Sequence, residues 1–374
     1  MTNNQQKKKW PRVIISGGGT GGHIFPAVAI AKGIQEKYPD AEILFVGAKG
    51  RMEMEKVPAA GFKIEGLWIS GLQRGSILKN LLFPFKVISS VFKALRIIRK
   101  FKPDVAVGVG GYASGALLYA ATMKKIPALI QEQNSFPGIT NKMLKNRVQR
   151  ICVAYDNMDR FFPKDKIILT GNPVRKEITK LEGKKERGLE KFNLDKTRPV
   201  VLVVGGSLGA RSINHAIDAD LQKFADADAQ LIWQTGKLYT EQASKRVADV
   251  GKAGIMTFDF LTEMDLAYAA ADIVISRAGA LAVSELCLVK KPCILVPLPT
   301  AAEDHQTKNA LSLVNYNAAI LVKDVNAKSN LVDEALSLLK DNERCEKLAY
   351  NMDKLAFANA TETIVNEVIS LIKK

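Results

Sequence analysis

The sequence predicts an α/β protein built from two Rossmann-like domains, and three observations carry that prediction. The chain has 374 residues, which is more than one ordinary hydrophobic core accommodates. Short apolar segments alternate with amphipathic ones along most of it, as in parallel sheets covered by helices. A strand, a glycine-rich turn and a helix follow one another twice, over residues 13–37 and again over residues 200–224.

The first domain is expected to span residues 1–175. Residues 1–10 are expected to be a frayed tail and not a secretory signal, because no apolar h-region of a signal peptide follows their lysines. Its predicted strands are Val13–Ser16, Ile43–Val46, Val105–Val109, Ala128–Gln131, Ile151–Val153 and Ile167–Thr170. Its patterned helices include Pro26–Lys37 and Lys86–Phe101. Pro84 is expected to interrupt any longer helix before the second of these.

The second domain is expected to span residues 176–353, opening with a charged segment over residues 176–198. Its predicted strands are Val200–Val204, Gln230–Gln234, Ile273–Ser276 and Ile294–Val296. A helix is expected over Ser212–Phe224. The last segment, Lys354–Lys374, is predicted to be helical and to pack back on the first domain.

Composition limits the function classes. Apolar residues make up 47% and charged residues 25%, as in soluble globular proteins, and no run of 18 apolar residues exists. The four cysteines lack metal-binding spacing and are expected to be reduced thiols. The net charge of +16 predicts an anionic partner. Nucleic acid is disfavoured as that partner because only 7% of the residues are aromatic and the basic stretch is aliphatic.

The first glycine-rich turn, GGGTGG over residues 17–22, has five glycines in six positions. It fits a dinucleotide fingerprint, but the second strand ends at Val46–Lys49 with no carboxylate to hold a ribose, which argues against nicotinamide and flavin. No Walker-type lysine follows it. A diphosphate at the following helix N-terminus therefore fits best, and a tight structural turn is the alternative.

The second turn, GGSLGAR over residues 205–211, adds the hydroxyl of Ser207 and the guanidinium of Arg211. Two such loops predict two phosphate-bearing ligands that meet in a cleft between the domains. Two Asp-x-Asp pairs occur, Asp218 with Asp220 and Asp226 with Asp228. They lie in or after the predicted helix and away from any strand end, so they are expected to be solvated carboxylates, and neither a metal nor another cofactor is predicted.

Seven motifs together resemble those of the MurG family, in the same order. They are GGGTGGHIFPA (17–27), VGGYASG (109–115), QEQN (131–134), TGNPVR (170–175), GGSLGAR (205–211), SRAGALAVSE (276–285) and DHQTKNA (304–310). The resemblance covers residues 12 to about 360. One departure is Gln131, where the family usually has His. The segment between Pro297 and Asp304 also looks longer than in some relatives.

The resemblance implies a GT-B glycosyltransferase, with two Rossmann-like domains facing across a cleft. It implies inverting transfer of GlcNAc from UDP-GlcNAc to the 4-hydroxyl of the muramyl sugar of undecaprenyl-pyrophosphoryl-MurNAc-pentapeptide (lipid I), giving lipid II of peptidoglycan. It further implies a peripheral position on the cytoplasmic face of the cell (inner) membrane and partners among cell-wall synthesis or division proteins. A glycolipid synthase and a nucleotide-sugar epimerase are the rival interpretations.

The resemblance also implies the binding residues. Ser207 and the Gly205–Gly209 turn would hold the donor diphosphate, Arg175 would meet the donor, and Glu285 would accept hydrogen bonds from the ribose. The remaining contacts to donor or sugar would come from Thr20, Gly21, Gly22, Asn134, Leu261 (against the uracil), Ala280 and Leu281 (through their backbone) and Gln306 (to the GlcNAc hydroxyls). For each residue a capping or core role is the alternative.

His23 is the predicted catalytic base. Inverting transfer needs a group that takes the acceptor's proton while the transferred sugar gains oxocarbenium character. An imidazole at a helix N-terminus is disfavoured as a cation, so it is suited to accept a proton. The alternative is that His23 only hydrogen-bonds a phosphate or the loop backbone. His215 is expected to be structural, and His305 is a candidate for touching the donor.

Residues 66–103 contain eight basic residues and no acidic one. An apolar tip beside basic residues suits an anionic membrane surface, where each Lys or Arg contributes about 1 kcal/mol. The residues assigned to the membrane or the acceptor are Ile77, Lys79, Leu81, Leu82, Phe83, Phe85, Lys86 and Tyr112. For Lys86–Phe101 the alternative, an ordinary Rossmann helix with a solvated face, is favoured.

Overall fold

The structure, a computed structural model, describes residues 10–71, 81–206 and 208–372. The chain divides into two compact units. The first unit comprises Met1–Val174 and the returning segment Asn359–Lys374, and the second comprises Arg175–Ala358. The return to the first unit therefore begins after α15 (Asn342–Lys354) has ended in the second unit.

The first unit contains a seven-stranded parallel sheet in the order β3-β2-β1-β4-β5-β6-β7. Its strands are β1 (Arg12–Gly17), β2 (Glu42–Ala48), β3 (Lys63–Leu67), β4 (Val105–Gly110), β5 (Ala128–Glu132), β6 (Arg150–Val153) and β7 (Ile167–Leu169). The six predicted strands are confirmed. The strand β3 was missed because Lys63, Glu65 and Gly66 make it polar, as suits a strand at the sheet edge.

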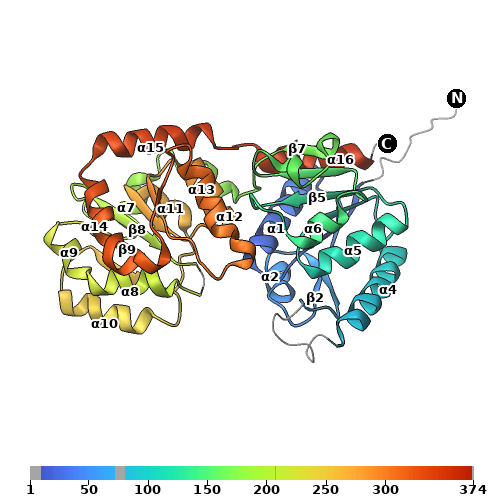
Figure 1. Cartoon of the computed structure of the whole chain (residues 1–374), viewed down its shortest axis with the longest axis horizontal. Coiled ribbons are helices and arrows are strands. Elements are labelled where there is room, and N and C mark those ends of the chain that lie inside the picture. The colour runs from blue at the N-terminus through green and yellow to red at the C-terminus, as the bar shows by residue number, and fades with distance from the viewer. Residues whose placement is uncertain (1–9, 72–80, 207, 373–374) are drawn as a thin grey trace. The chain divides into compact units, whose positions relative to one another are not determined.

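Helices cover both faces of this sheet. One face packs against α1 (Gly21–Lys37), α2 (Glu53–Ala59) and the returning helix α16 (Ala360–Ile372). The other packs against α4 (Phe83–Phe101), α5 (Tyr112–Met123) and α6 (Ile139–Leu144). Figure 1 shows α4 and α5 side by side. The same layered arrangement therefore uses a C-terminal helix to complete the core of the N-terminal unit.

Two helix predictions in this unit were wrong at their starts. The helix α1 begins at Gly21, five residues before Pro26, because Thr20 is extended and serves as the N-cap within the glycine loop. Pro84 lies in the first turn of α4 and does not interrupt it. A proline at that place removes only an N–H that has no partner within the helix, so it is compatible with the helix start.

The second unit contains a six-stranded parallel sheet in the order β10-β9-β8-β11-β12-β13. Its strands are β8 (Val200–Val204), β9 (Gln230–Gln234), β10 (Ile255–Phe258), β11 (Ile273–Ser276), β12 (Cys293–Leu295) and β13 (Ile320–Leu321). The short strands β10 and β13 were not predicted. The helix expected over Ser212–Phe224 is two helices, α8 (Arg211–Ala219) and α9 (Leu221–Asp226), separated at Asp220.

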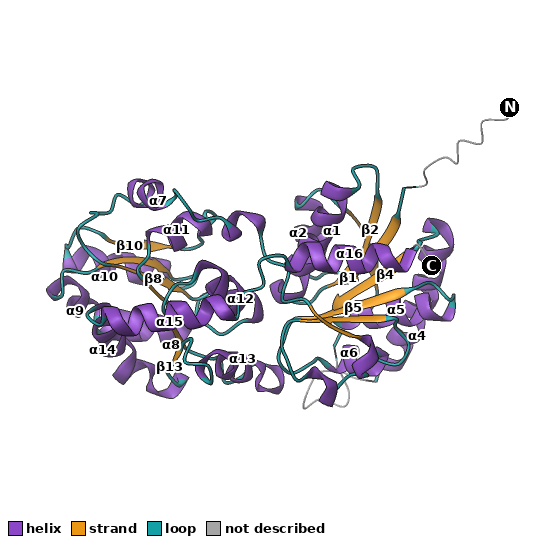
Figure 2. Ribbon diagram, turned by 90° about the horizontal axis from the view of Figure 1, so that it is seen from above, coloured by secondary structure: helices purple, strands orange, loops and turns teal. Residues whose placement is uncertain are grey.

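The remaining helices of this unit surround its sheet, which Figure 2 shows in orange. They are α7 (Lys185–Lys191), α10 (Thr240–Val250), α11 (Met264–Ala270), α12 (Ala280–Val289), α13 (His305–Val314), α14 (Ala327–Leu339) and α15. Side chains of α8, α9, α10 and α14 join the strands in one apolar core around Trp233 and Phe224. The sheet is thus buried, as parallel sheets generally are.

Each sheet reverses its strand order at one place. In the first unit this switch lies between β1 and β4, and in the second between β8 and β11. Ligands of open parallel sheets bind beyond the carboxyl ends of the strands at such a switch. The segments that follow these strand ends are the glycine loop at 17–22, the turn at 110–111, the loop at 205–209 and the segment at 277–279. Both predicted glycine loops therefore stand at the expected positions.

Candidate active-site residues in the two units

The first glycine loop is partly filled by a buried carboxylate that the sequence did not indicate. Glu53, at the start of α2, is fully buried. Its Oε1 accepts from the backbone N–H of Ala48 at 2.9 Å and its Oε2 from the N–H of Gly19 at 3.0 Å. A Cβ at Gly18 would meet the Glu53 carboxyl carbon at 2.5 Å. A carboxylate of α2 therefore does lie at the end of the second strand, but it is occupied by backbone donors and is fully buried, so it is inaccessible to a ribose.

His23 lies in the first turn of α1, half-buried beside the end of β4. Its Nδ1 is 2.9 Å from Oε1 of Gln133, and its ring lies over Gly110, where an added Cβ would meet Nδ1 at 2.7 Å. Thr20 and Gly22, next to it, are exposed. The first helical turn, with its positive dipole end, therefore places Thr20, Gly21, Gly22 and the imidazole of His23 together at the sheet's switch point.

The QEQN motif ends β5 and supplies a second fixed group. Glu132 is buried, and its carboxylate accepts hydrogen bonds from Asn134 N (3.0 Å), Asn134 Nδ2 (3.3 Å), Gly138 N (3.1 Å) and Asn141 Nδ2 (2.8 Å). This carboxylate fixes the turn after β5, and with it the predicted site residue Asn134, which is half-buried. Glu132 itself was not among the predicted site residues, although it belongs to the motif.

In the second unit the predicted donor residues Arg175 and Glu285 lie in contact. Glu285, in α12, is 8% exposed. Its Oε1 accepts from Arg175 Nη2 at 3.2 Å, and its Oε2 accepts from the hydroxyl of Tyr268 at 3.2 Å. Burial raises the pKa of Glu285 above its ordinary value, and the guanidinium of Arg175 and the hydroxyl of Tyr268 oppose that rise. Tyr268 was not predicted, because a tyrosine inside an apolar helix gives no sign of its partner.

The other predicted donor residues surround the carboxyl ends of the second sheet. Leu261 is buried, and its backbone N–H donates to Oε1 of Gln234 at 3.3 Å. Ala280 and Leu281 form the first turn of α12. Gln306, in α13, accepts at Oε1 from the backbone N–H of Leu298 at 3.0 Å, which ties α13 to the preceding segment. Ser207 lies outside the described residues, as do Ile77 and Lys79 of the apolar stretch.

Arg277, which was not among the predicted site residues, connects several segments near the carboxyl ends of the second sheet. Its Nη1 donates to the carbonyl oxygens of Val296 (3.0 Å) and Pro297 (3.3 Å) and pairs with Asp324 at 2.5 Å. Its Nη2 donates to the hydroxyl of Ser212 at 3.0 Å. The guanidinium therefore connects the ends of β11 and β12 with the start of α8.

The carboxylates of the two Asp-x-Asp pairs bind side chains of the protein. Asp218 accepts from the hydroxyl of Tyr239 at 2.5 Å, and Asp220 pairs with Lys223 at 3.2 Å. Further along, Asp226 accepts from Gln222 at 2.9 Å, while Asp228 pairs with Arg198 (3.0 Å) and Lys252 (2.9 Å). Within the described part of the chain, no cluster of three or more His, Cys, Asp and Glu has a metal-binding arrangement. His215 faces the ring of Tyr239, with the ring centres 5.5 Å apart.

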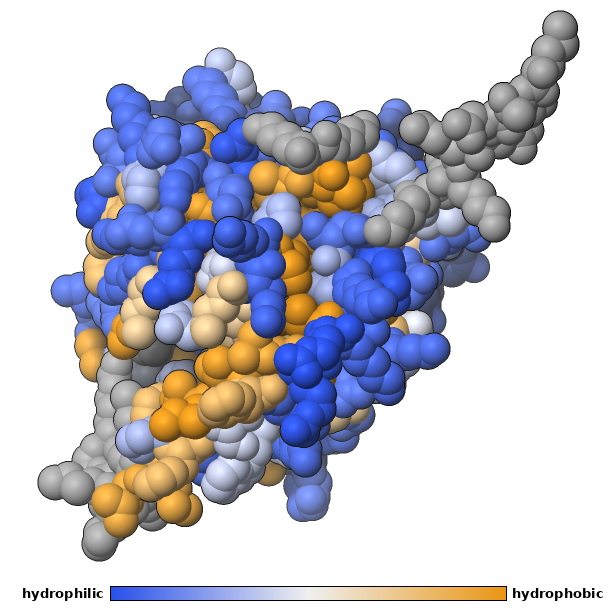
Figure 3. All heavy atoms as spheres, turned by 90° about the vertical axis from the view of Figure 1, so that its right-hand side faces the viewer, coloured by the Kyte–Doolittle hydropathy of each residue, from blue (hydrophilic) through white to orange (hydrophobic). Residues whose placement is uncertain are grey.

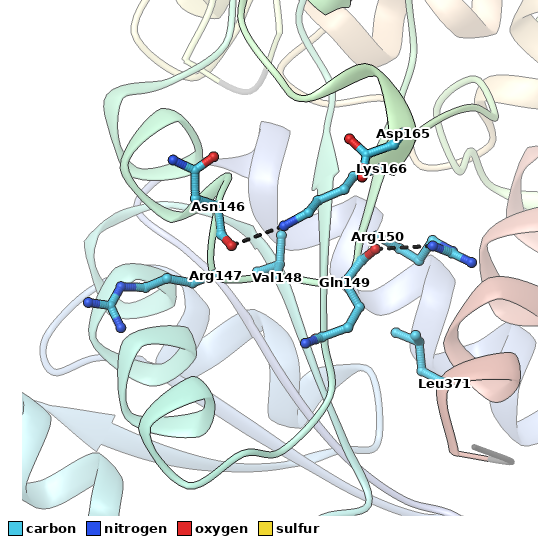
Figure 4. A pocket seen from close by; sticks show the side chains of 8 residues that line it. All are labelled: Asn146, Arg147, Val148, Gln149, Arg150, Asp165, Lys166 and Leu371. Atoms are coloured by element: carbon cyan, nitrogen blue, oxygen red, sulfur yellow. Dashed lines mark hydrogen bonds between the residues drawn. The ribbon is translucent and has the colours of Figure 1, made fainter.

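A surface cavity of about 280 Å³ in the first unit contains none of the predicted residues (Figure 4). Its cations already have partners in the protein. Arg147 stacks over the ring of Tyr119 at 4.6 Å, Arg150 pairs with Glu367 at 3.5 Å, and Lys166 donates to the carbonyl of Asn146 at 3.0 Å. Figure 4 shows the two arginines directed away from each other. The cavity therefore lacks converging charges and is not a candidate site.

Comparison with known proteins connects these residues to one family. The chain matches the glycosyltransferase family 28 N-terminal domain over residues 13–153 and the glycosyltransferase family 28 C-terminal domain over residues 200–368. A protein of Parabacteroides distasonis, named UDP-N-acetylglucosamine–N-acetylmuramyl-(pentapeptide) pyrophosphoryl-undecaprenol N-acetylglucosamine transferase, is 53% identical over 97% of this chain and 99% of its own. One of the same name from Cytophaga hutchinsonii is 55% identical over 96% of this chain and 97% of its own. The chain belongs to this transferase family.

The crystal structure of MurG of Acinetobacter baumannii, 29% identical in sequence, superposes with a TM-score of 0.79 over 96% of this chain and 99% of that one. The predicted family and its GT-B architecture of two Rossmann-like units are thereby confirmed. Within this family framework, the structure brings His23 and Thr20–Gly22 together in the first unit and Arg175 and Glu285 together in the second.

Proposed function

We propose that this chain transfers GlcNAc from UDP-GlcNAc to the MurNAc sugar of undecaprenyl-pyrophosphoryl-MurNAc-pentapeptide, lipid I, and so forms lipid II. The observation that carries the proposal is identity above 50% over nearly the full length of relatives named for this transfer. Both units contribute to that match, so the residues of each unit are considered for one of the two substrates.

The donor is assigned to the second unit. The two carboxylate oxygens of Glu285 accept hydrogen bonds from side chains, one from Arg175 and one from Tyr268. A donor of a bound ligand can replace a side-chain donor at such an oxygen. Ribose hydroxyls are such donors, and hydrogen bonds to an ionised acceptor are the strong ones. When the ribose binds, Arg175 is released and its charge becomes available to the diphosphate. The backbone of Leu261, Ala280 and Leu281 and the amide of Gln306 complete this set.

The acceptor chemistry is assigned to the first unit. His23 takes the proton of the acceptor hydroxyl as that oxygen bonds to the anomeric carbon, and the bond to the leaving UDP breaks with inversion. We assign the binding of sugar or phosphate groups in this unit to Asn134, which Glu132 fixes, and to the first turn of α1. Tyr112, at the start of α5, is about half exposed on the same unit.

The test is transfer of radiolabelled GlcNAc from UDP-GlcNAc to a short-chain lipid I analogue in EDTA. We expect labelled disaccharide from the wild type. The variant His23→Ala is expected to lose about 10²-fold or more in kcat, the contribution of a general base, with donor affinity kept. The control is His215→Ala, the same change at a histidine that packs on Tyr239. Hydrolysis or epimerisation of UDP-GlcNAc without disaccharide would contradict the proposal.

We further propose that the first unit docks on an anionic membrane surface. In the described residues no helix has the length and apolar character needed to cross a bilayer. On α4 and the residues just before it, Leu81, Leu82, Phe85, Ile88 and Phe92 are each more than half exposed. Figure 3 shows the apolar side chains of this face gathered in a band between hydrophilic ones.

The cations around this band differ in availability. Lys86 donates to the hydroxyl of Ser70 at 2.9 Å, and Lys93 donates to the carbonyl of Gly66 at 2.6 Å, so both help to fix α4 on the unit. Arg96, Arg99 and Lys100, further along α4, are exposed. These three are the side chains on this helix that we assign to anionic headgroups. Phe83 is half-buried and is therefore a weaker candidate for insertion than Phe85.

Vesicle co-sedimentation tests the membrane proposal. Wild type is expected to bind vesicles that contain phosphatidylglycerol more strongly than pure phosphatidylcholine, with binding that weakens as salt rises. Phe85→Asp is expected to reduce this binding severalfold. Val325→Asp, at a residue 83% exposed in the second unit, is the matched control. Equal binding by wild type and Phe85→Asp would overturn this assignment.

A further inference from the structure

A chain of side-chain amides runs from His23 into the core of the first unit. Oε1 of Gln133 lies 2.9 Å from Nδ1 of His23. Nε2 of Gln133 contacts Oε1 of Gln131, and Nε2 of Gln131 donates to Oδ1 of Asn172 at 3.0 Å. The three amide residues are each at most 2% exposed. A network buried to this extent keeps the orientation that its fixed partners impose.

Backbone carbonyls determine that orientation. Nε2 of Gln133 donates to the carbonyl oxygens of Val109 at 2.8 Å and of Gln131 at 3.0 Å, and these oxygens can only accept. At the far end, Nδ2 of Asn172 donates to the carbonyl oxygen of Gln133 at 3.0 Å. Reversing either amide would place oxygen against oxygen in the core. Oε1 of Gln133 must therefore face His23 as an acceptor.

An acceptor beside Nδ1 determines where the proton of a neutral imidazole resides. Nδ1 must carry the hydrogen and donate it to Gln133, which leaves Nε2 with a free lone pair. Gly110 permits this placement, because its φ of 108° and the absence of a Cβ allow the ring to lie against the end of β4. Gln133 thus fixes the tautomer of His23 in the way that a backbone carbonyl or a carboxylate does for other functional histidines.

We propose that Gln133 and Gln131 are positioning residues that hold neutral His23 as its Nδ1–H tautomer. This inference rests on the proposed function, in which His23 is the base. Nε2 then takes the proton of the acceptor hydroxyl while that oxygen bonds to the anomeric carbon and the bond to UDP breaks. The resulting imidazolium donates from Nδ1 to Gln133 and later releases its Nε2 proton to solvent. Gln131 acts indirectly, because its Oε1 accepts from Nε2 of Gln133 and so helps to fix the Gln133 amide.

Nitrogen NMR of the ¹⁵N-histidine-labelled full chain, without substrates, tests the tautomer directly. The chain has three histidines, and the variant His23→Gln identifies the signal of interest by its loss. In the wild type at a pH where the ring is neutral, we expect Nδ1 to show the protonated shift and Nε2 the unprotonated one. A wild type with Nε2 protonated would overturn the proposal, whatever the variants do.

Variants separate the amide network from general packing. Gln133→Met keeps the side-chain length and removes the acceptor, so the His23 signals are expected to move toward the Nε2–H tautomer that free histidine prefers. Gln35→Met, at an exposed glutamine on the same helix as His23, is the matched control and is expected to leave them unchanged. Gln131→His retains one acceptor and one donor nitrogen and is expected to preserve the Nδ1–H tautomer. An Nδ1–H tautomer that persists in Gln133→Met would contradict the proposal.

Kinetics supply a second readout. Gln133→Met is expected to lower kcat between about 10-fold and 100-fold with KM for UDP-GlcNAc unchanged, because general-base catalysis contributes about 10²–10⁴ and the tautomers still interconvert. A lowered donor affinity with unchanged kcat would overturn the positioning role. The spectrum needs no substrate, so absence of GlcNAc transfer by the wild type would count against the proposed function and not against the tautomer.

Discussion

The two glycine-rich loops occupy equivalent places in their units but differ in what fills the space over their glycines. In the first unit the Glu53 carboxylate lies against Gly18 and accepts from the N–H of Gly19. In the second unit Gly206 has a φ of 81°, and a Cβ there would meet no heavy atom within 4 Å among the described residues other than its chain neighbours. The first loop is therefore filled at Gly18 by a carboxylate, whereas the second is approached most closely by backbone atoms, Ala210 N at Gly205 and Thr235 O at Gly209. Each loop also has one glycine with open space over it, Gly19 in the first and Gly206 in the second.

This difference shows what a glycine-rich motif can and cannot indicate. Both loops follow a strand and precede a helix, which is the arrangement of phosphate-binding loops. In the first loop, however, the space above Gly18 is taken by a carboxylate, and a free phosphate there would face its negative charge. The exposed first turn of α1, at Thr20 to Gly22, is the part of that loop that remains for an anion. We therefore expect the two loops to respond differently to substitution.

The largest effect is expected from Gly18→Ala. The added methyl would overlap the carboxyl group of Glu53, which is itself buried and held by two backbone donors. Overpacking of this kind costs about 2–3 kcal/mol of the free energy of unfolding. Gly22→Ala is the control, because a methyl there meets only Thr20 Oγ1 at an ordinary 3.6 Å. Denaturant unfolding followed by circular dichroism measures both, and equal midpoints for Gly18→Ala and wild type would refute the filled-loop interpretation.

The next largest effect is expected from Glu53→Gln. A carboxylate satisfies the N–H groups of both Ala48 and Gly19, whereas an amide has one oxygen and would turn an NH₂ group toward the other donor. Leaving one buried donor unsatisfied costs about 1–3 kcal/mol. Glu55→Gln, at a nearby residue of α2 whose side chain is 77% exposed, should change stability by less than about 0.5 kcal/mol. A Glu53→Gln variant with the wild-type melting temperature would show that Glu53 does not organise the loop.

Gly206→Ala tests the open glycine of the second loop. An alanine with this positive φ costs about 1–2 kcal/mol, yet no clash accompanies it. Its methyl would enter the space that we propose for the donor diphosphate, so calorimetry should show UDP affinity reduced several-fold and uridine affinity much less. Gly251→Ala is the matched control, because Gly251 has a φ of 63° and its nearest neighbour is Ala248 O at 3.8 Å. Equal UDP binding by the two variants would argue against the diphosphate at this loop.

The sequence predicts the fold of this chain well where strands are apolar and continuous. The strands β8, β9 and β11 occur at the predicted residues, because Val200–Val204 and its neighbours are apolar and buried. The predictions fail at ends and edges. The start of α1 depends on the extended backbone of Thr20, the helix after β8 breaks at Asp220, and β13 has only two residues. Local geometry of this kind leaves no clear periodicity in the sequence.

The site is predictable as far as motifs extend. The motifs predict His23, Arg175 and Glu285 as site residues, but they do not predict the partners Gln133 and Tyr268, which reach them through hydrogen bonds across the fold. Gln133 is 110 residues from His23, and Tyr268 is 17 residues from Glu285. Glu53 is the extreme case, since it belongs to none of the motifs and reaches Gly19 from 34 residues away. Such contacts are set by the crossing of helices and strands, which the chain order alone does not reveal.

The smallest effect is expected from Tyr268→Phe, a variant that tests how the buried carboxylate of Glu285 differs from that of Glu53. Glu53 is held by backbone donors and stays fixed, whereas Glu285 is held by the side chains of Arg175 and Tyr268. Tyr268→Phe removes one of these donors, so at neutral pH the KM for UDP-GlcNAc is expected to rise about 3- to 10-fold, equivalent to about 1 kcal/mol, with kcat little changed. Tyr350→Phe, at a tyrosine 63% exposed in the same unit, should have no effect.

The pH dependence of the same variant makes the prediction sharper. Burial raises the pKa of Glu285, and the hydrogen bond from the Tyr268 hydroxyl lowers that pKa. Removal of this hydroxyl should therefore raise the pKa of Glu285 further. A protonated Glu285 is a weak acceptor for ribose hydroxyls, and UDP affinity should therefore fall as pH decreases through this pKa. In Tyr268→Phe the fall should begin at a higher pH than in wild type, and in Glu285→Gln it should be absent. Superimposable pH profiles for wild type and Tyr268→Phe would show that the ribose does not hydrogen-bond to Glu285. The donor would then be held by the second glycine-rich loop and by backbone groups alone.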